Sequence, residues 1–121
     1  MKNSLGSNRP VDIQLDADVV MLDLSSAIPC GLILNELITN SFKYAVDGDK
    51  TLKIDIKMRH HNNLVELEVR DNGKGLVENS LQNQYSLGME LINSLSEQID
   101  GTHQFRNDNG LVFNLSFRLK N

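Results

Sequence analysis

Residues 34–45 read LNELITNSFKYA, and this stretch decides most of what can be expected of the fold. Hydrophobic residues recur through it at helical spacing and continue back through residues 27–33. Ser25 or Ser26 can cap such a helix, and Pro29 is tolerated in a first turn. The pattern therefore predicts one long helix that ends at residue 45.

Three polar residues of this helix, Glu36, Asn40 and Lys43, lie within about 60° of one another at about 100° per residue. The predicted buried face opposite them consists of Leu34, Ile38 and Ala45. An oxygen ligand, a cation and a carboxylate together suit a metal-bound triphosphate. The alternative is a solvated face on which Glu36 and Lys43 attract each other.

A second polar signal is Asp71, at the end of an alternating strand. Asp71 has the same parity as the apolar residues of that strand, so it should point to the buried side, where an unpaired carboxylate is costly. An adenine amine could donate to it. Gly73 and Gly75 follow within DNGKG (residues 71–75) and would let a ligand approach the backbone. The alternative is an Asx turn that leaves the strand.

A third segment is YSLGM, residues 85–89, which is predicted to open a second helix. Free N–H groups at a helix N-terminus attract phosphate, and Gly88 would allow close approach. Residues 76–85 would then form a lid over the nucleotide. The alternative is that Ser86 caps the helix and Gly88 only serves packing. The chain contains no Walker-type phosphate loop.

The rest of the chain alternates as strands and turns. Predicted strands cover residues 11–15, 19–22, 52–58, 65–70, 102–106 and 111–119, with turns at 16–18, 60–63 and 107–110. The second helix is expected over residues 87–99, with Gly101 as its left-handed cap. Strands with one apolar face need a cover of helices. We therefore predict an α+β fold, a two-layer α/β sandwich whose mixed, largely antiparallel sheet is covered on one face by helices.

Composition limits the possible functions. The 121 residues carry a net charge of −4, which does not favour nucleic acid. The single cysteine, Cys30, is expected to be a buried packing thiol in a reducing compartment. No apolar run is long enough to span a membrane. These features predict a cytoplasmic domain over residues 11–121 without membrane contact, preceded by a flexible arm or expression remnant at residues 1–10.

In order and approximate spacing, the three segments resemble the ATP-binding catalytic domain of sensor histidine kinases. This domain shares its superfamily with type II topoisomerases, Hsp90 chaperones and MutL repair proteins. Residues 34–45 resemble its N box, residues 71–76 its first glycine box, and residues 86–89 its second. The approach AIPCGLIL (residues 27–34) is similar to a bacterial subgroup with a short lid. The resemblance implies the Bergerat fold.

The resemblance also implies a role for each matching residue. Asn40 would coordinate Mg²⁺, Glu36 would act as the base or orient the reacting groups, and Lys43 would neutralise phosphate charge. Asp71 would bind the adenine amine, and Tyr44 would border the nucleotide. The remaining nucleotide-contacting residues would be Gly73, Gly75, Leu76, Leu87, Gly88 and Met89. A departure is the last glycine box, which keeps a single glycine in residues 109–111.

The implied activity is transfer of the γ-phosphoryl group of ATP to a histidine on a separate dimerisation segment, with a response regulator as the indirect partner. His60, His61 and His103 are not expected to be acceptors or metal ligands. Two alternatives remain: an anti-sigma-factor or serine-kinase-like relative that phosphorylates a serine, and a non-catalytic nucleotide-binding interaction module.

Overall fold

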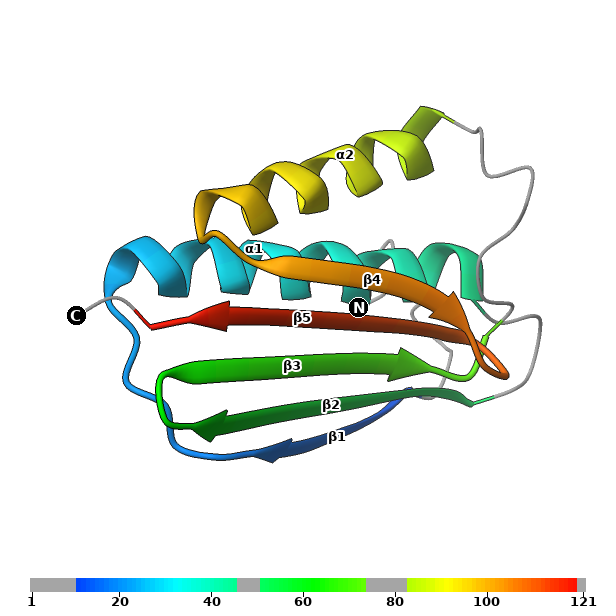
Figure 1. Ribbon diagram of the computed structural model, residues 1–121. Helices are drawn as coiled ribbons and strands as arrows, with labels where there is room; N and C mark the ends of the chain where they lie inside the picture. The colour runs from blue at the N-terminus through cyan, green and yellow to red at the C-terminus, as the bar shows by residue number, and fades with distance from the viewer. Residues whose placement is uncertain (1–10, 46–50, 74–82, 120–121) are drawn as a thin grey trace, which may run out of the picture.

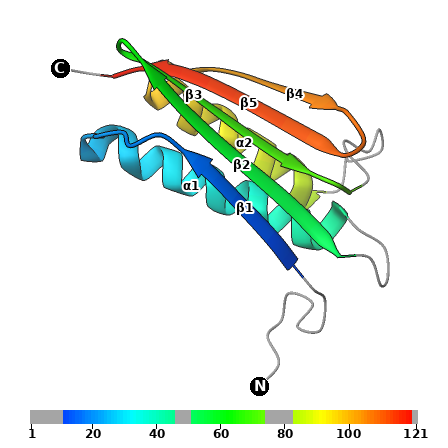
Figure 2. The same ribbon diagram turned by 90° about the horizontal axis from the view of Figure 1, so that it is seen from below.

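The computed structural model describes residues 11–45, 51–73 and 83–119. Its strands are β1 (Val11–Ala17), β2 (Leu52–His61), β3 (Leu64–Asp71), β4 (Thr102–Asn107) and β5 (Leu111–Arg118). Its helices are α1 (Leu24–Asn40), η1 (Ser41–Ala45) and α2 (Asn83–Gln98). The strands form one sheet in the order β1-β2-β3-β5-β4, and both long helices lie on one face of it (Figures 1 and 2). The predicted two-layer α+β sandwich is confirmed.

The sheet is mixed because β1 pairs with β2 in parallel, whereas the other pairs are antiparallel. The two hairpins turn at the positions that the sequence marks. Asn62 takes a φ of 56° between β2 and β3, and Asn109 and Gly110 take φ values of 55° and 139° between β4 and β5. Asparagine and glycine are the residues that adopt positive φ at least cost.

The core lies between the helices and the inner face of the sheet. Its side chains come from alternate positions of the three central strands and from one stripe on each helix, as the period-2 and helical patterns require. The largest fully buried members include Ile33, Ile54, Leu67, Ile92 and Phe113. Burial of a side chain of this size contributes roughly 1.5–3 kcal/mol, so this layer is the main source of stability.

The predicted strand at residues 19–22 is wrong, and so is the turn at 16–18. β1 continues to Ala17, which pairs with Met58, and residues 18–23 then form no strand or helix. Val19 and Met21 are 88% and 85% exposed. This segment crosses from the sheet to the helix layer, so it has no neighbouring strand to pair with. The apolar residues of this segment do not by themselves show that a partner strand is missing.

Several predicted boundaries also shift. α1 begins at Leu24 with Asp23 at the N-cap, which places Pro29 beyond the first turn. β2 includes His60 and His61, which were expected in the connection. α2 begins at Asn83, four residues before the predicted start at residue 87.

The predicted left-handed cap at Gly101 is wrong as well, because Asp100 takes that conformation, with a φ of 52°. Gly101 instead allows close packing. A Cβ there would lie 2.9 Å from Leu115 Cδ1.

The predicted buried face of α1 is only partly confirmed, because Leu34 and Ile38 pack at the margin of the core. Cys30, Ile33 and Leu37 form the buried stripe, and Asn40 continues it with 7% exposure. Leu34 and Ile38 are only partly buried. α1 carries apolar residues around most of its circumference, including exposed Leu24, Ile28 and Leu32. Helical periodicity therefore could not decide which of two apolar stripes faces the sheet.

Candidate nucleotide-binding site

The predicted polar residues gather at one end of the molecule. There the C-terminal end of α1, the end of β3, the first turns of α2 and the β4–β5 turn lie close together (Figure 1). This arrangement follows from topology. α1 runs toward the end at which β3 finishes, and α2 runs back from that end beside α1. Segments about 30 to 50 residues apart in sequence thus share one edge of the sandwich.

Asp71 is buried at this edge, as its strand parity predicted. It is 7% exposed and is held by three hydrogen bonds. The backbone N–H groups of Gly73 and Leu111 donate to Oδ1 at 2.9 and 3.0 Å, and the Ser41 hydroxyl donates to Oδ2 at 2.8 Å. A buried carboxylate is tolerated when such donors replace water. The polar partners that the sequence required therefore come from the protein.

The sequence interpretation overlooked Ser41, which is buried with 4% exposure. It follows Asn40, and the two consecutive side chains are both buried. Successive residues of an α-helix are 100° apart, so one of two such neighbours usually faces away. Ser41 keeps α-helical dihedral angles, with φ −60° and ψ −41°, and both neighbours are buried because α2 contacts Asn40 and β3 contacts Ser41. π-helical hydrogen bonding begins at Ser41. Such local π geometry occurs frequently at functional sites, but a sequence pattern does not show it.

Gly88 connects the first helix with the second. A Cβ on Gly88 would lie 3.2 Å from Asn40 Nδ2 and 3.0 Å from Glu36 Cδ. The absence of a side chain at Gly88 thus leaves room for the two functional groups of α1. Glu36 is partly buried at this contact, whereas Asn40 is buried. The structure therefore brings Glu36, Asn40 and Gly88 together.

The free N–H groups of the second helix lie earlier in the chain than its predicted start at residue 87 implied. Because α2 begins at Asn83, Gly88 lies in its second turn, where backbone N–H groups are bonded within the helix. The N–H groups left without helical partners belong to the first turn, residues 83–86. Gly88 leaves space beside α1, and its own N–H lies within the helical hydrogen-bonding pattern.

The other predicted residues are less constrained. Lys43 is exposed on η1, Met89 is half-buried, and Leu87 is 63% exposed. Gly73 follows β3 and donates to Asp71. Tyr44 belongs to η1. Gly75 and Leu76 lie outside the described residues, as do most of the predicted lid residues.

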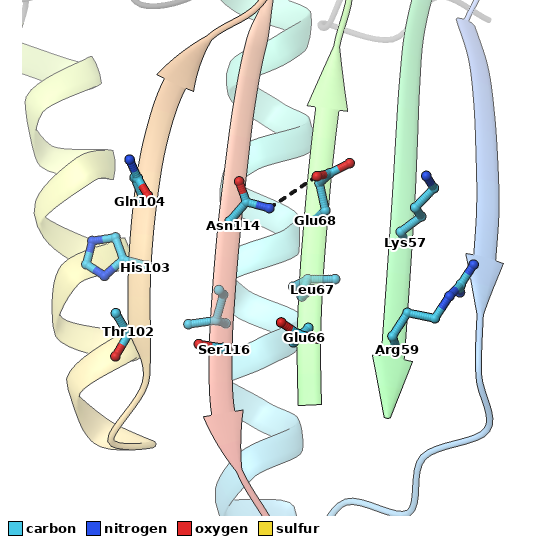
Figure 3. A pocket seen from close by; sticks show the side chains of 11 residues that line it. Lys57, Arg59, Glu66, Leu67, Glu68, Thr102, His103, Gln104, Asn114 and Ser116 are labelled. Atoms are coloured by element: carbon cyan, nitrogen blue, oxygen red, sulfur yellow. Dashed lines mark hydrogen bonds between the residues drawn. The ribbon is translucent and has the colours of Figure 1, made fainter. Parts of the chain in front are cut away.

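A separate hollow of about 350 Å³ lies on the opposite face of the sheet. Apart from His103, which faces α2, its polar side chains lie on the face of β2 to β5 away from the helices (Figure 3). Asn114 donates to Glu68 there at 3.2 Å, and Lys57 and Arg59 lie on the neighbouring strand. The hollow contains none of the predicted site residues.

Among the described residues, no helix combines the length and apolar content needed to cross a membrane, and no group of three or more His, Cys, Asp or Glu side chains could hold a metal ion. His103 contacts Asn93 and Ser96 on α2 at 2.6 and 3.2 Å. This histidine is thus part of the packing between β4 and α2.

Comparison with known proteins agrees with this geometry. Residues 26–121 match the family described as histidine kinase-, DNA gyrase B-, and HSP90-like ATPase. A curated relative, the sensor histidine kinase PdtaS of Mycobacterium tuberculosis, is 28% identical over 109 residues, which cover 84% of this chain. The chain spans about a fifth of that relative, 21% of its length.

Solved structures show the same fold. The histidine kinase domain of the blue-light activated histidine kinase EL346 from Erythrobacter litoralis superposes with a TM-score of 0.78 at 20% identity, over 90% of this chain and 52% of that one. Full-length ShkA in complex with AMPPNP gives a TM-score of 0.66 at 16% identity, over 91% of this chain and 26% of that one. The chain belongs to the family of histidine kinase-, DNA gyrase B- and HSP90-like ATPases, as an ATP-binding catalytic domain of the histidine kinase type.

Proposed function

We propose that this domain binds Mg-ATP at the edge formed by α1, β3 and α2 and transfers its γ-phosphoryl group to a histidine on a separate dimerisation segment. One observation carries the proposal. Consecutive residues of the first helix reach two different elements: Asn40 lies against Gly88 of α2, and Ser41 donates to Asp71 of β3. A nucleotide needs separate contacts for its phosphates and its base, and this edge offers both kinds.

Asp71 would accept a hydrogen bond from the adenine amine, because its carboxylate oxygens are the acceptors in all three described hydrogen bonds. Glu36 would orient the reacting groups or accept a proton during transfer. Lys43, exposed near the end of the helix, would neutralise phosphate charge. In this view the domain acts mainly by positioning and electrostatic stabilisation, as phosphoryl transfer generally requires.

The residues present fit one magnesium ion held jointly with phosphates. Asn40 presents an amide beside the space that a side chain at Gly88 would fill. Magnesium prefers oxygen ligands, and in phosphate-transferring sites it uses few protein atoms and several waters or phosphate oxygens. Asn40 would hold the ion through its amide oxygen. The ion would supply charge neutralisation for the phosphates.

The expected partners follow from the same proposal. The phosphoacceptor histidine would belong to a dimerisation domain in the same or a partner protein, and a response regulator would receive the phosphoryl group afterwards. We expect the domain to work in the cytoplasm, without nucleic acid or direct membrane contact. PdtaS and EL346 are histidine kinases by name, which supports this class of acceptor.

Transfer can be tested with γ-labelled Mg-ATP and a purified histidine-bearing dimerisation segment. The proposal expects label on that segment that is lost in acid and stable in base, because phosphohistidine has this stability. Glu36→Gln is the matched variant: it retains size and should transfer poorly. Acid-stable label on a protein partner would support the serine-kinase-like alternative. Absence of nucleotide binding at millimolar ATP would overturn the proposal and leave an interaction module.

A further inference from the structure

We propose that Ser41 is a positioning residue for nucleotide recognition: with two backbone amides it fixes the Asp71 carboxylate so that Oδ2 alone accepts a hydrogen bond from the 6-amino group of a purine. This inference rests on the proposed nucleotide site. It adds a residue and a specificity mechanism, namely discrimination between 6-amino and 6-oxo purines.

Asp71 Oδ1 accepts hydrogen bonds from two backbone N–H groups. Gly73 N–H donates to it at 2.9 Å and Leu111 N–H at 3.0 Å. A carboxylate oxygen offers about two lone-pair positions. Both positions of Oδ1 are therefore used by the backbone. Gly73 follows the end of β3 and Leu111 begins β5, so two separate segments fix the plane of the carboxylate.

Asp71 Oδ2 accepts fewer described hydrogen bonds than Oδ1. Among the described residues it receives one hydrogen bond, from Ser41 Oγ at 2.8 Å. One acceptor position of Oδ2 then remains for a ligand. Since a carboxylate bound by three donors presents only lone pairs, that position favours a ligand N–H over a ligand carbonyl. A 6-amino purine satisfies this requirement, whereas a 6-oxo purine places an acceptor there.

The location of Ser41 lets it reach Asp71 from the first helix. Ser41 is 4% exposed, directly after Asn40, at the point where the helix becomes π-helical. Asn40 and Ser41 are about 100° apart around the helix, so one side chain lies against Gly88 of α2 and the other reaches Asp71 of β3. Ser41 therefore links the base-binding carboxylate to the helix that carries the phosphate-side groups. Removal of its hydroxyl would release Oδ2 without touching the backbone donors of Oδ1.

The first test compares ligands that differ only at the purine 6-position. Wild type, Ser41→Ala and Ser41→Thr would be titrated calorimetrically with Mg-ATP and with Mg-purine riboside triphosphate, which lacks the amine. Ser26→Ala is a matched control, because Ser26 is 1% exposed on the same helix and its hydroxyl has no hydrogen-bond partner among the described residues. Thermal unfolding of each variant would be recorded in parallel.

We expect Ser41→Ala to weaken ATP binding about tenfold, the scale of one hydrogen bond to a charged group. Binding of purine riboside triphosphate should change less than about twofold, because the contact that Ser41 positions is missing from that ligand. Ser41→Thr should restore most of the ATP affinity, and Ser26→Ala should leave both affinities unchanged. An equal loss for both ligands would indicate a merely structural role and overturn the inference.

A second variant, Asp71→Asn, keeps the proposal testable even if Ser41→Ala does not fold. The two backbone donors at Oδ1 require an oxygen, so the amide nitrogen must occupy the Oδ2 position. Ser41 would then accept a hydrogen bond, and the ligand would face a donor. We expect the preference for ATP over inosine triphosphate to fall at least tenfold, or to reverse. An unchanged preference would overturn the assignment of Oδ2.

The outcomes separate this inference from the proposed function. A wild-type protein that bound neither triphosphate would remove the nucleotide site and this inference with it. A wild-type protein that bound ATP, with Ser41 variants that showed no change in discrimination at the 6-position, would leave the site intact and refute only the role of Ser41.

Discussion

Gly88 of α2 faces Asn40 of α1 so closely that a Cβ on Gly88 would stand 3.2 Å from the Asn40 Nδ2 atom. The same Cβ would stand 3.0 Å from Glu36 Cδ. The missing side chain at Gly88 thus defines the space between the two helices at the candidate site.

Replacement of Gly88 by alanine should impair phosphoryl transfer more than folding. The new methyl group would push the Glu36 carboxylate aside, because the end of a glutamate side chain can move at little cost. We expect about a tenfold lower transfer rate, since small displacements of reacting groups are costly. The rate with labelled ATP and the thermal midpoint would be measured together.

Gly31→Ala is the matched control for Gly88→Ala. Gly31 lies on the exposed side of α1, and a Cβ there would meet nothing within 4 Å. Alanine should raise helix stability by roughly 0.5–1 kcal/mol at this position and leave transfer unchanged. Equal effects of the two substitutions on transfer would mean that the space beside Glu36 has no role.

Glu36→Gln should separate catalysis from binding. The substitution preserves size but removes the charge that would orient or deprotonate the reacting groups. General acid–base roles contribute about 10²–10⁴-fold to rates, so we expect at least a hundredfold slower transfer. ATP affinity, measured by calorimetry, should stay within about threefold. A fully active variant would exclude Glu36 as the base.

Asn40→Asp is the companion of Glu36→Gln. Its side chain keeps an oxygen for the metal but places a negative charge beside the phosphates and loses the amide nitrogen that faces Gly88. We expect transfer to fall more than nucleotide binding, as judged by the same two measurements. A variant that lost binding and kept its turnover of bound ATP would contradict the assigned role.

Cys30 should be unreactive in the folded protein. It is 4% exposed, and burial raises the pKa of its thiol from 9.0 to about 11. Burial favours the neutral thiol, so the unfolded chain ionises first. The stability contributed by this group is complete below about pH 9 and is lost as the pH rises through 11, by about 3 kcal/mol at most.

Two measurements check this prediction. A disulfide reagent at pH 8 should modify Cys30 rapidly in denaturant and very slowly without it. Urea unfolding between pH 8 and 11 should then show a steeper loss of stability for wild type than for Cys30→Ala, which lacks the titrating group. Fast labelling of the native protein would show that the thiol is accessible and would remove the basis of the pH effect.

Gly110 should tolerate no side chain. Its φ is 139°, and a Cβ would collide with the backbone carbonyl of Asp71. We expect Gly110→Ala to lower the free energy of unfolding by more than about 2 kcal/mol and to weaken ATP binding, because the neighbouring Leu111 N–H supports Asp71. Asn109→Gly, at a φ of 55°, should be neutral or slightly stabilising in the same urea titrations.

The amino-acid sequence alone was sufficient to predict much of the architecture. Alternation specified β2, β3 and β5, since a period of two places one face in the core whatever the neighbours are. Parity also placed Asp71 on the buried side. The hairpin turns followed from asparagine and glycine, whose positive φ is a local property. These features depend on short-range chemistry, which a sequence expresses directly.

Other features depended on contacts between distant segments, so only the tertiary structure decided them. α1 had two apolar stripes, and packing on the sheet selected the one that ends in Asn40. The burial of Ser41, and its hydrogen bond to a residue 30 positions later, have no local signature. The sequence determined which groups the site contains; the packing of α1 against β3 and α2 determined which of them meet, because contact depends on where whole elements lie.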